Sequence, residues 1–207
     1  MGLFNRRALV LVALLSMSLA GCDKLFPQKS AVTADDMSLG SPTAKVTVIE
    51  YASASCAHCA RFNNEVYPAF KAKYIDTGKI HYVFREFLTP PPEFAAAGFL
   101  TARCAGKDKY FSVLDAIYHN QAAMFQSGDF RGGLLRIAQS AGLSEAQFNA
   151  CVEDDKAIKA LNDRVENYAK TDGIDSTPTF VVNGKKLVGE QSMATLDTAI
   201  SDAQAGK

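Results

Sequence analysis

The feature that most constrains the fold is a β-branched run that leads directly into two cysteines. Lys45–Tyr51 reads KVTVIEY, which predicts a buried strand. After a short loop, Cys56 and Cys59 stand with two residues between them. Apolar side chains then recur at every fourth position over Phe62–Tyr74, as on one face of a helix that Pro68 should kink. The cysteines are therefore expected where a strand gives way to a helix.

The rest of the pattern predicts an α/β fold with a helical block between two halves. A second strand, Ile80–Phe87, completes a strand–helix–strand unit, whose strands are usually parallel. The prolines at 90–92 predict a stiff connector, and every periodic segment between residues 93 and 171 has helical spacing. Strands return over Thr179–Gly189 with the hairpin signal Asn183-Gly184, and a last helix follows.

The composition is that of an ordinary globular protein. The chain has 207 residues, of which 48% are hydrophobic and 21% charged, enough for one sizeable core or a core with an insertion. Its formal net charge is +0, so no basic surface indicates a nucleic-acid partner.

The first residues have the pattern of an export signal. Arg6 and Arg7 precede an apolar run at 8–20, which is shorter than the roughly 20 residues that a membrane-spanning helix needs. No other stretch of the sequence is long and apolar enough to span a membrane. We therefore expect residues 1–21 to be a signal peptide and the protein to be exported.

The end of this signal resembles the lipobox of bacterial lipoproteins. Leu19-Ala20-Gly21-Cys22 implies cleavage before Cys22 and lipidation of that cysteine, with ordinary cleavage after Ala20 as the alternative. Asp23 resembles an inner-membrane retention signal, and residues 22–37 are expected to form a membrane tether. The pattern predicts a periplasmic protein that a lipid at Cys22 anchors to the inner membrane.

The position of Cys56 at a helix N-terminus favours a reactive thiolate. Unpaired backbone N–H groups and the positive end of the helix dipole stabilise an anion there. His58 could also donate to the Cys56 thiolate, and both effects lower a thiol pKa. Cys59 lies one turn further in, which makes it the resolving sulfur. A substrate would then pass through a mixed disulfide on Cys56.

Three other uses of this cysteine pair are weighed against disulfide exchange. Covalent haem attachment needs a histidine directly after the second cysteine, where this chain has Ala60. A structural zinc needs four ligands, and Cys56, His58 and Cys59 offer three, so we expect no metal. A purely structural disulfide remains possible, although so short a loop gains little from closure.

A distant Thr-Pro step adds a second signal. Pro178 follows Thr177 at the start of a strand, where it could be cis or an ordinary trans proline of an edge strand. Together with the strand–CxxC–helix pattern and the helical block, this step resembles the DsbA-type thiol-disulfide oxidoreductases, from about Met37 to Ala203. The stretches that carry the resemblance further are Val48–Cys59, Ser38–Tyr51 and Cys104–Gln121.

The resemblance implies a thioredoxin-like fold with an inserted all-helical domain. Residues 38–88 and 172–207 would form the thioredoxin-like domain, and residues 89–171 the insertion. Pro178 would be cis beside the two cysteines, and Thr177 would offer backbone groups to an extended peptide.

Glu50 matches the acidic strand residue of that family. The resemblance implies a buried acid under Cys59 that assists its proton transfer, whereas a solvated acid or a pair with Arg85 are the alternatives. The sequence departs from the family at Ala57, where many members carry proline. That departure leaves the direction of electron flow open, and we expect His58 to make the disulfide oxidising.

Cys104 and Cys151 both fall on helices of the block. They could be two buried free thiols, but export to an oxidising compartment favours a structural disulfide. The long loop it would close makes such a bond worth roughly 4 kcal/mol.

Three functions follow from these expectations. The first is a lipid-anchored, monomeric oxidase of reduced exported proteins that needs no cofactor and is reoxidised by a membrane partner of the DsbB kind. The second is a disulfide reductase or isomerase that receives electrons from the membrane. The third is a lipoprotein that binds unfolded polypeptides and in which the cysteine pair is incidental.

Overall fold

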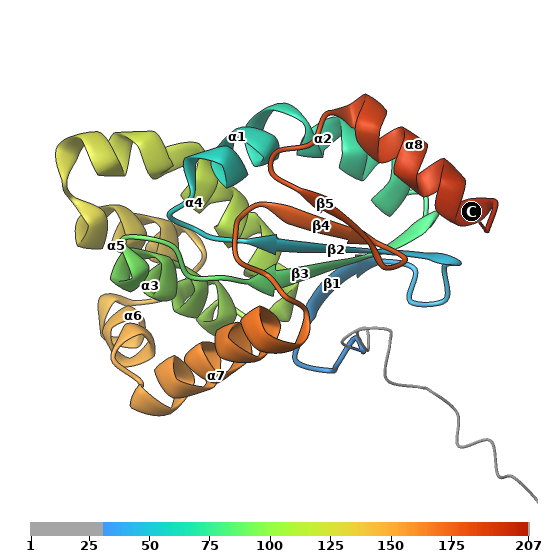
Figure 1. Ribbon diagram of the computed structural model, residues 1–207. Helices are drawn as coiled ribbons and strands as arrows, with labels where there is room; N and C mark the ends of the chain where they lie inside the picture. Colours follow the sequence, from blue (N-terminus) through green and yellow to red (C-terminus); the bar gives the residue numbers. More distant parts are fainter. Residues whose placement is uncertain (1–30, 207) are drawn as a thin grey trace, which may run out of the picture.

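The computed structural model describes residues 31–206, which fold around one mixed sheet (Figure 1). The strand order is β1-β3-β2-β4-β5, with β2 and β3 parallel and the other neighbours antiparallel. The parallel pair confirms the crossover expected from the sequence. The strands are β1 Met37–Gly40, β2 Val46–Ala52, β3 Ile80–Glu86, β4 Thr179–Val182 and β5 Lys185–Val188.

Helices cover both faces of this sheet. In Figure 1, α1, α2 and α8 lie above it, α7 lies below it, and α3, α4, α5 and α6 gather at the left. None of the helices within residues 31–206 combines the length and the hydropathy that crossing a bilayer requires. The helices are α1 Ala57–Glu65, α2 Tyr67–Phe70, the π-helical turn η1 Lys71–Ile75, α3 Pro92–Cys104, α4 Lys107–Ser127, α5 Phe130–Ser140, α6 Glu145–Val152, α7 Asp155–Thr171 and α8 Met193–Gln204.

The helix after the cysteines breaks where proline was expected to disturb it. The first segment ends at Glu65, and Pro68 stands in the first turn of α2. A proline is tolerated there because the first N–H groups of a helix have no intrahelical partner. Val66 lies between the two segments, so α1 remains a separate, short helix that carries the cysteines.

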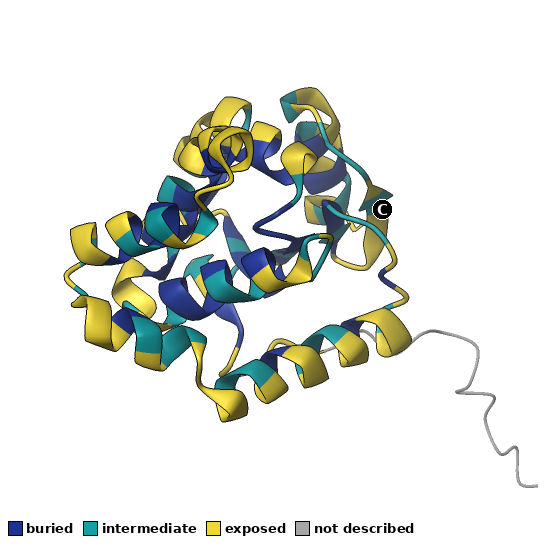
Figure 2. Ribbon diagram, turned by 90° about the vertical axis from the view of Figure 1, so that its left-hand side faces the viewer, coloured by how far each residue is buried: buried dark blue, intermediate teal, exposed yellow. Residues whose placement is uncertain are grey.

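The strands are mostly buried, whereas the helices keep an exposed outer face (Figure 2). The main apolar core lies between the sheet, α1, α2 and the inserted helices. A smaller apolar cluster lies on the opposite face, where Tyr168 of α7 packs with Ile49, Tyr51 and Val83.

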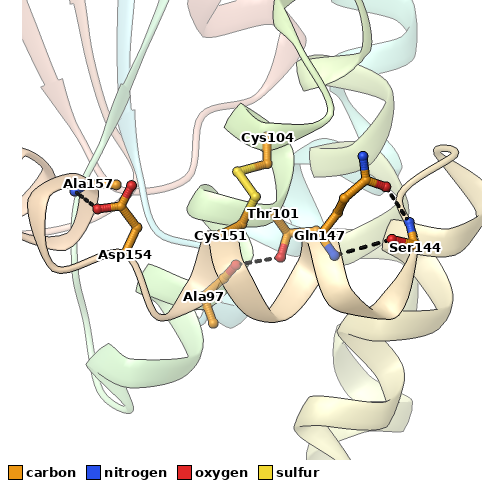
Figure 3. The surroundings of a disulfide bond; sticks show 8 residues. All are labelled: Ala97, Thr101, Cys104, Ser144, Gln147, Cys151, Asp154 and Ala157. Carbon is orange, nitrogen blue, oxygen red and sulfur yellow. Dashed lines mark hydrogen bonds between the residues drawn. A yellow bond between two sulfur atoms is a disulfide. The ribbon is translucent and has the colours of Figure 1, made fainter.

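A disulfide joins Cys104 at the end of α3 to Cys151 of α6 (Figure 3). Their Cα atoms lie 6.3 Å apart, and the expected pairing is confirmed. The capping box of Ser144 and Gln147 begins α6 and satisfies its first backbone donors. The inserted domain therefore has its own covalent bond, away from the other two described cysteines.

The expected tether differs from the structure over residues 31–37. Met37 belongs to β1, and Asp36 is 8% exposed. The Asp36 carboxylate accepts two hydrogen bonds of 3.0 Å from Arg85, and the Ala31 carbonyl accepts a third. A guanidinium buried on the sheet needs such a counter-charge, so this segment is held against the folded domain. The expected signal at 1–21, the lipidation site Cys22 and Asp23 lie outside the described residues.

Candidate active site

The two free cysteines of the described chain lie where β2 gives way to α1. Cys56 is the N-cap of α1, with extended backbone angles, and its Sγ accepts a hydrogen bond from the Cys59 N–H at 3.4 Å. Small residues between Ala52 and Cys56 let the chain turn from strand to helix in a tight loop. Cys56 is half-buried, whereas Cys59 is fully buried.

The two thiols are shifted in opposite directions. The pKa of Cys56 falls to about 5, chiefly because of its hydrogen bond with the Cys59 side chain. Burial acts in the opposite direction and raises this pKa, but by less. Thr177 and the backbone N–H groups of Cys59 and His58 lower it further. Burial raises the pKa of Cys59 well above its ordinary value, and the bond to Cys56 adds to that rise. The pair therefore holds a thiolate at the surface and a thiol beneath it.

The Thr177–Pro178 peptide bond is cis, as expected, and it lies beside the cysteines. The Thr177 carbonyl oxygen is 3.4 Å from the Cys56 Sγ, although 121 positions separate them in the chain. The Gly189 N–H donates to the Pro178 carbonyl at 2.8 Å, which ties this loop to the end of β5. The tertiary fold thus builds the site from both halves of the interrupted domain.

Glu50 of β2 is buried, with 3% of its surface exposed. Its carboxylate accepts a hydrogen bond of 2.6 Å from the Tyr82 hydroxyl of the neighbouring strand. Burial raises the pKa of Glu50 to about 7, and the nearby negative Cys56 adds to the rise. The alternatives for Glu50 are wrong, because it is not solvated and Arg85 forms its ion pairs with Asp36 and Asp172.

His58 differs from expectation. Its Nδ1 lies 3.2 Å from the Glu190 Oε2, and 62% of its side chain is exposed. Arg61 reaches the same carboxylate oxygen, also at 3.2 Å. His58 lowers the pKa of Cys56 through its backbone N–H. Its imidazole pairs instead with Glu190, an acid that the sequence analysis did not single out. Within residues 31–206 no cluster of three or more potential metal ligands is present.

The sequence analysis also missed Gln121 of the inserted helix α4. Its side-chain amide is 5% exposed and donates to the carbonyls of Ala54, at 2.7 Å, and Cys56, at 3.2 Å. Those carbonyls belong to the loop that presents the redox pair. The sequence did contain a signal for this role, because Gln121 is a polar residue between the apolar Ile117 and Met124 on the buried face of α4. A buried amide there needs a hydrogen-bond partner.

Comparisons with known proteins show the family to which this chain belongs. The model of the family described as Thioredoxin matches residues 32–202. A protein of Rickettsia bellii, named as a candidate protein-disulfide oxidoreductase, is 32% identical over 87% of this chain and 71% of its own length. The Wolbachia pipientis protein alpha-DsbA1 has a solved structure that matches with a TM-score of 0.78, at 28% identity, over 84% of this chain and 94% of its own. This chain belongs to the DsbA-type branch of the thioredoxin family.

Two further comparisons show how far this likeness extends. A Rickettsia conorii protein with the same kind of name is 36% identical over 170 residues, which are 82% of this chain and 60% of that protein. This chain therefore spans less than two thirds of that relative. BdbD from Bacillus subtilis has a TM-score of 0.73 at 20% identity, over 83% of this chain and 94% of its own, and shares the fold.

Proposed function

We propose that this DsbA-type protein oxidises the thiols of exported polypeptides by thiol–disulfide exchange through Cys56 and Cys59. The observation that carries the proposal is the stabilised Cys56 thiolate, with its pKa lowered to about 5 above a buried Cys59 thiol. Stabilising the thiolate stabilises the reduced pair, which makes the corresponding disulfide a strong oxidant.

The exchange begins when a substrate thiolate attacks the Cys56 sulfur of the Cys56–Cys59 disulfide. The bond between the two cysteines breaks, a mixed disulfide forms on Cys56, and Cys59 leaves as a thiolate. A second substrate thiolate then attacks the substrate sulfur of the mixed disulfide and releases Cys56 as a thiolate. Two electrons have passed from the substrate to the pair, and the substrate holds a new disulfide.

Glu50 supplies the proton that the departing Cys59 thiolate takes up. A carboxyl group with a pKa of about 7 is partly protonated at neutral pH, and the charged form of Glu50 adds to the raised pKa of Cys59. Proton transfer between groups of suitable pKa is ordinary general acid catalysis. In the reverse direction the Glu50 carboxylate takes the proton from the Cys59 thiol.

The loop of Thr177 and Pro178 holds the substrate. Its backbone lies beside the Cys56 sulfur, where an extended polypeptide would pair with Thr177 as an added strand. Such pairing reads the peptide backbone and tolerates many side chains, as an enzyme that acts on many exported proteins requires.

The cellular setting follows from the signals at the start of the sequence. A lipid at Cys22 would anchor the protein in the periplasm, at the inner membrane, where a partner of the DsbB kind would reoxidise Cys56 and Cys59. The reduced exported proteins are its substrates. This part of the proposal rests on the lipobox resemblance and on the names of the relatives.

The test is the equilibrium of the Cys56–Cys59 pair with glutathione, followed by oxidation of a reduced unfolded protein. A reduction potential near about −120 mV indicates an oxidase, and one near about −270 mV indicates a reductase and contradicts the proposal. Cys56→Ser should abolish the exchange, while the variant with both Cys104→Ser and Cys151→Ser should retain it. Activity that survives Cys56→Ser would instead support a polypeptide-binding lipoprotein.

A further inference from the structure

Glu190 lies in the loop between β5 and α8, next to the redox site. The preceding residue, Gly189, donates its N–H to the carbonyl of the cis Pro178. The following residue, Gln191, donates its side-chain amide to the Val188 and Gly189 carbonyls. These bonds hold the loop backbone in place, so the Glu190 side chain is presented to the redox helix from a fixed position.

The Glu190 carboxylate binds two basic side chains of α1 with one oxygen. Oε2 lies 3.2 Å from the His58 Nδ1 and 3.2 Å from the Arg61 Nη1. His58 stands between the two cysteines, and Arg61 lies less than one turn further along the helix. The Glu190 side chain is 24% exposed, less than either partner, so it is the more enclosed member of the trio.

The ionisable groups around the Cys56 sulfur come from four elements. Glu50 of β2, Cys59 of α1 and Tyr118 of α4 interact with it electrostatically, and His58 and Arg61 of α1 pair with Glu190 of the loop. A basic side chain near Cys56 favours its thiolate, but the side chains of His58 and Arg61 are both paired with Glu190. Resting on the proposed function, we propose that Glu190 is a positioning residue that holds the side chains of His58 and Arg61 at its own carboxylate and so limits the oxidising power of the disulfide.

The direction of the effect follows from the reduction of the pair. Two glutathione molecules give two electrons to the Cys56–Cys59 bond, which breaks while one glutathione disulfide forms; Cys59 keeps a proton, and Cys56 releases its proton to solvent. Positive charge near the Cys56 thiolate favours this product, and negative charge disfavours it. Removing the Glu190 charge, and with it the pairing of His58, shifts the equilibrium toward the reduced pair.

The experiment compares the glutathione equilibrium of the full chain with that of Glu190→Gln. We expect the equilibrium constant to favour the reduced pair by roughly fivefold more in the variant, the order of effect that one screened charge produces near a half-buried group. The Cys56 thiolate, followed by its ultraviolet absorbance, should titrate at lower pH. Glu65→Gln is the matched control, because it removes the same charge from the exposed far end of α1 and should behave as the wild type.

Two further variants keep the outcome decisive. In a background that carries both His58→Ala and Arg61→Gln, Glu190→Gln should change the equilibrium by less than about twofold, since Glu190 acts through these two contacts. Glu190→Asp, which keeps the charge but shortens the side chain, should shift the equilibrium the same way by a smaller factor and serves if the Gln variant is unfolded. An unchanged or reversed equilibrium in Glu190→Gln, or an undiminished effect without His58 and Arg61, overturns the inference. A wild-type chain that does not exchange with glutathione contradicts the proposed function instead.

Discussion

Two glutamates on neighbouring strands are both buried but have different partners. Glu50 of β2 is 3% exposed and Glu86 of β3 is 1% exposed, and the strand register places Glu86 beside Ala52, two residues beyond Glu50 on the same face. Within the described chain, Glu50 has one hydrogen-bond donor, the Tyr82 hydroxyl, and no cation in contact. Glu86 accepts from Arg103 at 2.6 Å, from Arg164 at 2.8 Å and from the Tyr110 hydroxyl at 3.0 Å.

The difference shows how a fold separates stability from reactivity. The guanidinium groups of Arg103 and Arg164 come from α3 and α7, so their ion pairs with Glu86 link the inserted helices to the sheet. Glu50 is left without such compensation, and its pKa rises to about 7 because burial disfavours its charged form. A carboxyl group in that condition can exchange a proton near neutral pH.

The largest effect is expected from Glu86→Gln. The substitution leaves Arg103 and Arg164 without their shared counter-charge, and breaking a buried ion pair costs about 3 kcal/mol or more. We expect the free energy of unfolding to fall by that amount, measured by urea denaturation at pH 8. The glutathione equilibrium of Cys56 and Cys59 should not change, and a large change there would show that the two carboxylates do not serve separate purposes.

The same substitution at Glu50 should have the opposite sign. The folded state keeps the Glu50 proton up to a pKa of about 7, whereas the unfolded chain loses it near 4.5. Between these values the folded state binds more protons, so wild-type stability falls as the pH rises through this window, by roughly 3 kcal/mol in all. In Glu50→Gln that fall should disappear, and the variant should be about 2 kcal/mol more stable than the wild type at pH 8.

The measurement for Glu50→Gln is urea unfolding of the oxidised protein from pH 4 to 8, because Cys56 does not titrate in the disulfide. Glu65→Gln, at an exposed position, should keep the wild-type pH dependence. The exchange rate of Glu50→Gln should be lower, since the variant lacks the carboxyl group that we propose as the proton donor to Cys59. If Glu50→Gln were less stable than the wild type at pH 8, the conclusion that the charged Glu50 carboxylate lacks a compensating cation would be contradicted.

The smallest effect is expected from Tyr82→Phe. It keeps the ring that packs against Tyr67 and Phe70 but removes the hydroxyl that lowers the pKa of Glu50. Above pH 7 the charged carboxylate then lacks its donor, at a cost of about 1–2 kcal/mol. Below pH 5 the loss should be much smaller, and the pH profile of the exchange should move to higher pH. Equal losses at both pH values would mean that the hydroxyl acts only through packing.

Local sequence was enough to predict the elements that carry the redox pair. The β-branched run of β2 and the four-residue spacing after Cys59 have the periods of a strand and a helix, and Cys56 becomes the N-cap between them. The pairing of Cys104 with Cys151 was predicted from the oxidising compartment and is confirmed. The cis form of Pro178 came from the family resemblance, because a single sequence does not distinguish it from a trans proline.

The side-chain partners of the site were harder to predict, and some predictions were wrong. His58 was expected to face Cys56, but its partner Glu190 lies 132 residues away in the chain. Arg85 was offered as a partner for Glu50, but strand residues alternate between faces, and Arg85 points to the side of Asp36 and Asp172. Residues 31–37 have no periodicity, so nothing in their sequence indicated that Arg85 would hold them.

The sequence by itself determined that a strand would lead into the cysteines and that Cys56 would begin a helix, whereas the burial of Glu50 came only from the family resemblance. Both depend on backbone periodicity and on dipoles within a few residues. Only the tertiary structure decided which partner each charged or polar side chain meets. Two arginines pair with Glu86, the Tyr82 hydroxyl donates to Glu50, and the Glu190 carboxylate pairs with His58. Charge–charge energies depend on distance through space and on burial, and neither is written in the order of the residues.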